Sequence, residues 1–419
     1  MTRQKTVERN VAAANSGFAL WGLTCFVETF VQGSTFVLRM NSIAKIPPQR
    51  KAAKRCMPLY SRTVNKLRVF SVINDKSRNS SVDIFRSIAI ISVVIFHFGL
   101  LPYGYLGVDL FFVISGLLVG GLLTKDFLKG NNINFLKFFL QRGFKIWPSY
   151  YFFIIVGSLI AWCFYHDNRP DQIIPLWDIK RYIFFYQNYT GAPFHWSFDH
   201  VWSLCVEEHF YVLLPIMFLF IQAFVTKKHK VKALFVFVIL TIIAGIVFKN
   251  CSYFLTKGKD TYSATHNRID ALAWGVLLNL IITHFENQIK IKHIQTTSFL
   301  SGLLLFIFAL YFKTYHNVIF DKIYFHSIIP IAFFLMLLGI YHVNLSKFKI
   351  IRLIAYYSYN WYLWHPIFVF FIRDKIGLNV VGLILYLFIT FIVAVGSTIF
   401  IEEPMLKKRK LLISKIMKE

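Results

Sequence analysis

Two ionisable side chains, Arg86 and His97, lie in the otherwise apolar stretch FRSIAIISVVIFHFG, residues 85–99. They are eleven positions apart, which on an α-helix is about 1100° of rotation and a rise of about 16 Å, so both occupy one helix face. An ionisable group at membrane depth is costly and indicates function. We expect this face to line a route across a bilayer. The competing interpretation is that Arg86 reaches the interface and His97 bonds a neighbouring helix.

Three carboxylates are candidates to orient the imidazole of His97. Asp109 enters an apolar run from the same end of the membrane as His97, and a carboxylate beside a histidine can orient the imidazole and fix its tautomer. Glu207 and Glu208 are adjacent within the run HVWSLCVEEHFYVLLP, where ionised carboxylates require partners. We expect either Asp109 or one of the two glutamates to orient His97. The predicted catalytic residues are His97, Asp109, Glu207 and Glu208.

Two basic residues, Arg142 and Lys145, open the run FLQRGFKIWPSYYF and lie three positions apart, hence on one helix face. Neighbouring cations suit phosphate groups, so we expect these two and Arg86 to bind an anionic donor. Ordinary cytoplasmic charge explains Arg142 and Lys145 equally well. The secondary candidates, all in or beside apolar runs, are Ser115, Trp202, Arg268, Asp270 and His365.

The sequence offers little support for metal or serine-hydrolase chemistry. The five cysteines are scattered, without the spacing of a metal site or a disulfide framework. The chain also lacks the Gly-x-Ser-x-Gly turn of an α/β-hydrolase. We therefore expect no bound metal and no tightly bound cofactor.

The composition indicates that these residues lie in membrane helices. Hydrophobic residues make up 56% of the chain and aromatic residues 18%, which is too apolar for a soluble globular domain. We count ten runs that are long enough, or nearly so, to cross a hydrocarbon layer of about 30 Å. The expected spans are 84–100, 105–124, 146–165, 202–223, 233–249, 268–284, 298–312, 325–342, 353–372 and 379–401.

The distribution of charge predicts the topology. The net charge of +26 comes from basic residues that gather in alternate gaps between the apolar runs, such as KKHKVK at 227–232 and KKRK at 407–410. This alternation is the positive-inside pattern, and it places both termini in the cytoplasm. It also explains the positive charge without nucleic acid, which we do not expect as a partner. The predicted fold class is all-α, a polytopic membrane protein with about ten transmembrane helices.

The chain divides into three predicted parts: a basic N-terminal extension at 1–80, a membrane domain at 81–404 and a basic cytoplasmic tail at 405–419. The extension contains an interrupted apolar run, SGFALWGLTCFVETFVQGSTFVLRM. This run lacks the features of a signal peptide, and a weak helix is one alternative. A biological start downstream, for example at Met57, is another.

Taken together, several segments resemble the acyltransferase-3 family of integral membrane acyltransferases, whose members include enzymes that O-acetylate O-antigen and exopolysaccharides. The matching segments occur in the family's order and cover residues 81 to about 404: FRSIAIISVVIFHF, GVDLFFVISGLLV, RGFKIWP, VWSLCVEEHFY, RIDALAWG, YSYNWYLWHP and EEP. The resemblance implies an acyl-CoA donor, such as acetyl-CoA. It also implies that His97 is essential and that the arginines bind or position the donor.

One departure from the family pattern concerns the predicted donor site. The family commonly has Arg-x-x-Arg at the start of the third helix, and here the second residue is Lys145. Lysine keeps the charge but loses the bidentate fork of arginine. Some members also carry a fused extracytoplasmic SGNH esterase-like domain. We therefore expect this chain to act alone or with a separate envelope enzyme.

The expected function is transfer of an acyl group, acetyl above all, from acyl-CoA to a hydroxyl of a cell-envelope or secreted saccharide such as O-antigen or exopolysaccharide, including lipid-linked forms. The expected location is the bacterial inner membrane, with the bilayer, acyl-CoA and the saccharide as partners. The alternatives are a polysaccharide polymerase, a flippase or a transporter without acyl transfer.

Overall fold

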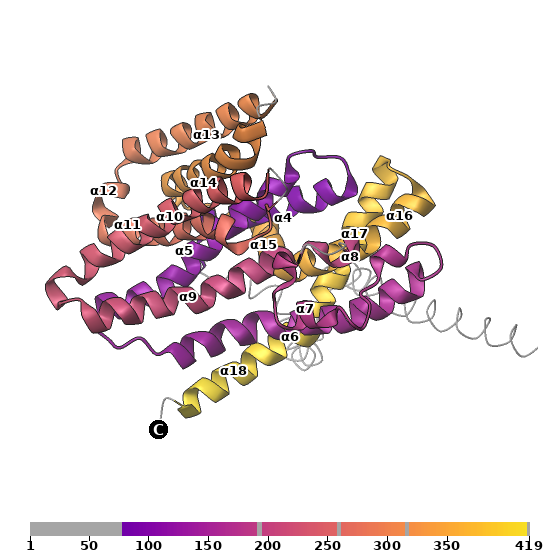
Figure 1. Cartoon of the computed structure of the whole chain (residues 1–419), viewed down its shortest axis with the longest axis horizontal. Helices are drawn as coiled ribbons and strands as arrows, with labels where there is room; N and C mark the ends of the chain where they lie inside the picture. Colours follow the sequence, from indigo (N-terminus) through magenta and orange to yellow (C-terminus); the bar gives the residue numbers. More distant parts are fainter. Residues whose placement is uncertain (1–77, 191–194, 258–260, 315–317, 417–419) are drawn as a thin grey trace, which may run out of the picture. The chain divides into compact units, whose positions relative to one another are not determined.

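The computed structural model describes residues 78–190, 195–257, 261–314 and 318–416 (Figure 1). The predictions for the N-terminal extension, apart from its last three residues, lie outside these ranges. Within them the chain is helical and contains no strand. The main helices are α4 (Ser80–Phe98), α5 (Gly107–Leu128), α6 (Phe135–Tyr165), α9 (Trp202–Phe224), α10 (Lys230–Leu255), α11 (Ile269–His284), α13 (Lys292–Thr314), α14 (His326–Ile340), α15 (Lys349–Trp364), α17 (Val380–Ser397) and α18 (Glu403–Ile416).

The predicted all-α polytopic class is confirmed. In the described part of the chain, eight helical stretches are long and apolar enough to cross a membrane. Two further expected spans are present as helices of 16 residues, α11 and α15. The short helices between the long ones are α7 (Ile179–Ile183), α8 (Trp196–Asp199), α12 (Glu286–Ile289) and α16 (Val369–Ile376).

The span expected at 353–372 is not one helix. It consists of α15, a 3₁₀ turn η7 (His365–Phe368) and α16. The break falls at Pro366, which has no backbone N–H to continue the α-helical ladder and stands at the start of the new turn. The interruption places His365 at the end of α15, buried in the protein interior.

Helix α4 holds both residues of the opening motif, and its two ends are defined by the sequence. The side chain of Asn79 accepts hydrogen bonds from the N–H groups of Ser81 and Val82, which caps the N-terminus. Gly99 ends the helix in the left-handed conformation, at φ 100°. Between these caps α4 packs against α5 and α15, with Val93 and other small apolar residues fully buried.

At two positions, helices α5 and α11 approach each other so closely that only glycine fits. A Cβ atom at Gly116 would lie 1.9 Å from the carbonyl oxygen of Leu272, and one at Gly275 would lie 2.0 Å from that of Val113. Glycine at these two positions therefore permits the close approach of the two helices. This contact fixes the position of α5, which carries Asp109 and Ser115.

Candidate active site

The three basic residues predicted to bind a donor come together at one cavity of about 120 Å³, here called the inner cavity. Arg86 enters it from α4, and Arg142 and Lys145 enter it from α6. Two other predicted site residues, Ser115 from α5 and Glu207 from α9, line the same cavity. The charge pattern predicts that the three basic residues lie toward the cytoplasm.

Each polar residue of the inner cavity is held by a neighbour. Arg86 Nη2 donates to Ser358 Oγ at 3.1 Å. The Glu207 carboxylate accepts from Ser115 Oγ at 3.1 Å and from the hydroxyl of Tyr211. Arg142 lies 5.5 Å from the centroid of the Tyr211 ring, and its Nε is buried without a hydrogen-bond partner among the described residues. A buried guanidinium N–H without a partner indicates a place for an anionic or polar ligand.

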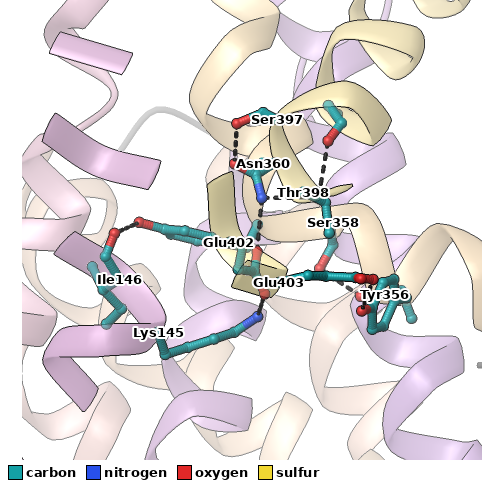
Figure 2. A network of polar contacts seen from close by, with 12 residues as sticks. Lys145, Ile146, Tyr356, Ser358, Asn360, Ser397, Thr398, Glu402 and Glu403 are labelled. Carbon is teal, nitrogen blue, oxygen red and sulfur yellow. Dashed lines mark hydrogen bonds and ion pairs between the residues drawn. The ribbon is translucent and has the colours of Figure 1, made fainter. Parts of the chain in front are cut away.

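Lys145 is held by a polar network at the C-terminal end of α17 (Figure 2). Its ammonium forms an ion pair with Glu402. The other carboxylate oxygen of Glu402 accepts from Asn360 Nδ2 at 2.7 Å, and Asn360 Oδ1 accepts from Ser397 Oγ at 2.8 Å. Glu402 thus connects α6, α15 and α17 beside the inner cavity, with Thr398 Oγ1 at 2.9 Å from Asn360 Nδ2.

His97 opens onto a different and larger cavity of about 460 Å³, here called the outer cavity. Two secondary candidates, Trp202 and Arg268, also line it. Arg86 and His97 therefore occupy one helix but serve two cavities, at opposite ends of α4. A route across the bilayer along this face of α4 stays a prediction.

The hydrogen bonds of His97 determine which of its nitrogens carries a proton in the neutral ring. His97 Nδ1 lies 2.9 Å from the carbonyl oxygen of Val93 and 3.2 Å from His365 Nε2. His365 Nδ1 in turn lies 2.8 Å from the carbonyl oxygen of Tyr362. A carbonyl only accepts, so Nδ1 is the donor in both rings. His365 Nε2 is then an acceptor, and His97 Nε2 retains a lone pair that can take a proton.

The structure does not have the expected contact between Asp109 and His97. Asp109 is fully buried and forms an ion pair with Arg268, which is also buried. Asp270, the other candidate carboxylate of that region, pairs with Lys249 of α10. Low dielectric strongly favours pairing of such charges over leaving them isolated, so each aspartate faces the nearest buried cation instead of a neutral imidazole.

The two glutamates do not orient His97 either. They lie on different sides of α9, because consecutive residues of a helix point in different directions. Glu207 faces the inner cavity, whereas Glu208 accepts from the indole N–H of Trp147 at 3.0 Å. Among the described residues, the partner that contacts the His97 ring is His365, not either glutamate. The prediction that a carboxylate orients His97 is therefore wrong, and His365, a secondary candidate, takes that position.

Most residues of the outer cavity were not among the predicted site residues; they include His200, Lys249, Lys313 and Tyr362. Lys249 could have been recognised as a candidate from the sequence, since a lysine in the apolar run IIAGIVFKNC is costly in a membrane. Lys313 pairs with Asp321 at 2.5 Å, a contact between two helices that spacing along the chain does not reveal. His200 and Tyr362 are ordinary residues of aromatic runs in the sequence.

Comparison with known proteins adds to this geometry. The Acyl_transf_3 family model, described as an acyltransferase domain, matches residues 79–402. The O-acetyltransferase OatA of Staphylococcus aureus, in strains NCTC 8325 and COL, is 28% identical over an alignment of 358 residues that covers 78% of this chain and 57% of OatA. The chain thus spans little more than half the length of these relatives. No solved structure matches it significantly.

The family match covers the whole region that carries the two cavities, from the cap of α4 to Glu402. It includes the apolar helices expected of a multi-pass membrane protein. The chain belongs to the acyltransferase-3 family of integral membrane acyltransferases.

Proposed function

We propose that this protein is an O-acetyltransferase of the bacterial inner membrane, which moves an acetyl group from acetyl-CoA to a hydroxyl of an envelope or secreted saccharide. The observation that carries the proposal is the placement of Arg86 and His97 on one helix, at two cavities of different chemistry. The names of the relatives, O-acetyltransferase OatA, support the choice of acyl group and of an oxygen acceptor.

The inner cavity is suited to the acyl end of the donor. Its cations, Arg86, Arg142 and Lys145, gather at one end of the helices, and the Nε of Arg142 has an open position for an acceptor atom. Sites that enclose a whole drug-sized ligand measure roughly 300–1,000 Å³. At about 120 Å³ the inner cavity admits the thin thioester arm only. We place the nucleotide outside the cavity, at the cytoplasmic mouth, with its phosphates toward Arg86, Arg142 and Lys145.

The outer cavity is suited to a polar acceptor. It is larger than the inner one, and Trp202 and Tyr262 supply flat apolar faces beside charged side chains such as Arg268. The lone pair on His97 Nε2 is the group available to accept the hydroxyl proton as the oxygen attacks the thioester carbonyl. The new C–O bond forms as the C–S bond breaks, and the proton passes from His97 to the sulfur, which leaves as the thiol of CoA.

The proposal is tested with inverted membrane vesicles that are permeabilised with mild detergent, so that both faces of the protein are accessible, together with radiolabelled acetyl-CoA and a crude glycan fraction. We expect base-labile label on the glycan from the wild type and none above background from His97→Gln. His97→Gln keeps similar bulk and hydrogen bonding but cannot act as a base, whose loss typically costs about 10²–10⁴-fold in rate. The matched control is His284→Gln, which alters an exposed histidine at the far end of α11.

Each result decides between classes of protein. Label on the glycan that depends on His97 supports the acetyltransferase. Wild-type membranes that transfer no acyl group from any acyl-CoA would instead favour a polymerase, a flippase or a transporter. Near-full activity in His97→Gln would reduce His97 to a packing residue.

A further inference from the structure

The inner and outer cavities share two of their lining residues, Val108 of α5 and Tyr362 of α15. These residues therefore form the partition between the side that carries Arg86 and the side that carries His97. Tyr362 is the larger of the two and is 6% exposed. An acyl group that enters beside Arg86 must pass this partition to meet an acceptor beside His97.

Tyr362 is held by contacts of two kinds. Its hydroxyl donates to the carbonyl oxygen of His200 at 2.7 Å and lies 2.7 Å from Ser203 Oγ. Its own carbonyl accepts from His365 Nδ1, the ring that contacts His97. The backbone of Tyr362 is therefore tied to the histidine pair, whereas its ring is kept in place by the hydroxyl contacts and by packing against the rings of Phe111, His200 and His365.

A partition is chemically useful because the outer cavity is large and has charged side chains such as Arg268 and Lys313, which can hold water beside His97. The base that activates an acceptor hydroxyl would equally activate a water molecule. The thioester would then be cleaved with water in place of the acceptor: the C–S bond breaks, a C–O bond to water forms, and free acid and thiol result. Closing a site against water is a recognised function of mobile groups in transferases.

We infer that Tyr362, together with Val108, is a gate between the two cavities, which passes the acyl thioester to His97 and limits its hydrolysis in the absence of an acceptor. This inference rests on the proposed acetyl transfer. It assigns to Tyr362 control over how the thioester divides between transfer and hydrolysis, not a part in bond making.

The test compares transfer to glycan with release of free acetate in the same vesicles, normalised to the amount of protein in the membrane. For Tyr362→Ala we expect the ratio of hydrolysis to transfer to rise by about tenfold, which corresponds to about 1.4 kcal/mol between the two barriers. Tyr362→Phe keeps the ring and should raise the ratio much less. The matched control is Tyr357→Ala, because Tyr357 is buried on the same helix but lines neither cavity.

A second variant works in the opposite direction. Val108→Phe adds bulk to the partition, so we expect it to reduce transfer and hydrolysis together while the apparent KM for acetyl-CoA stays near the wild-type value. An unchanged ratio in Tyr362→Ala, an equal rise in Tyr357→Ala, or full transfer in Val108→Phe would each overturn the gate. Absence of both reactions in the wild type would instead refute the acetyl transfer on which the gate rests.

Discussion

His365 Nε2 lies 3.2 Å from His97 Nδ1, with the two ring centroids 4.8 Å apart and the rings nearly perpendicular. The histidine proposed as the base is thus oriented by a second imidazole and by a backbone carbonyl, both of them neutral acceptors. When His97 takes a proton at Nε2, the Nδ1–H bond to His365 becomes charge-assisted and stronger. His365 is accordingly a positioning residue for His97.

Substitution of His365 tests this relationship. His365→Leu removes the acceptor, and loss of a hydrogen bond to a charged group, about 1.5–3 kcal/mol, predicts a fall in kcat of about 10- to 100-fold. The protonated form of His97 also loses support, so the acidic limb of the pH–rate profile should move to lower pH. His365→Gln offers an amide oxygen as acceptor and should recover much of the rate. Equal loss in both variants with an unmoved pH profile would mean that His365 only packs.

Arg142 provides the test of the donor site. Arg142→Ala should raise the apparent KM for acetyl-CoA by about 10- to 100-fold, the value of a charge-assisted contact, and leave the KM for the acceptor nearly unchanged. Lys145→Arg should be tolerated, because arginine can keep the ion pair with Glu402. Initial-rate kinetics with each substrate varied in turn give both constants. If Arg142→Ala left the KM for acetyl-CoA unchanged, Arg142 and Lys145 would serve only to set the membrane topology.

The ion pair of Asp109 and Arg268 predicts a loss of stability. Breaking a buried pair by removing one partner costs about 3–5 kcal/mol, whereas replacing both by apolar residues is often neutral. Asp109→Leu and Arg268→Met should therefore each lower the thermal midpoint of the detergent-solubilised protein, and the double variant should recover most of the loss. Thermal unfolding measured at equal detergent concentration gives the three values. If Asp109→Leu lost activity at an unchanged midpoint, Asp109 would have a role in the reaction itself.

The Lys/Arg alternation predicts a topology with both termini in the cytoplasm, and cysteine labelling tests it. In a cysteine-free background, Asn168→Cys should react with a membrane-impermeant reagent added outside intact cells, and Lys228→Cys should react only after permeabilisation. Both positions are exposed. Labelling of both from outside would invert or break the proposed arrangement and remove the cytoplasmic donor site.

The sequence was sufficient for features that depend on one helix at a time. The eleven-residue spacing of Arg86 and His97 predicts that they share one face of α4, and each of them lines a cavity along that helix. Neighbouring cations at Arg142 and Lys145 also face a single cavity. Such predictions succeed because helical geometry is local and nearly constant.

Contacts between helices could not be predicted in the same way. Asp109 and Arg268 are 159 positions apart, and His97 and His365 are 268 apart. Which of several buried cations a carboxylate meets depends on the lateral order and rotation of the helices, about which the spacing along one helix says nothing. The break at Pro366 could be anticipated from the missing N–H, but not the direction in which it turns His365.

Glu402 lies at the end of η8 (Thr398–Glu402), a π-helical turn between α17 and α18. A π turn accommodates one residue more than an α turn, so it changes the rotation of α18 relative to α17. Deleting one residue here would turn α18 by about 100° relative to α17. The ion pair of Lys145 is with Glu402 at the end of this turn, and the contact of Arg409 with the Gln141 carbonyl lies beyond it, in α18. The one extra residue of this π turn thus sets how α18 and its basic side chains are rotated relative to α6.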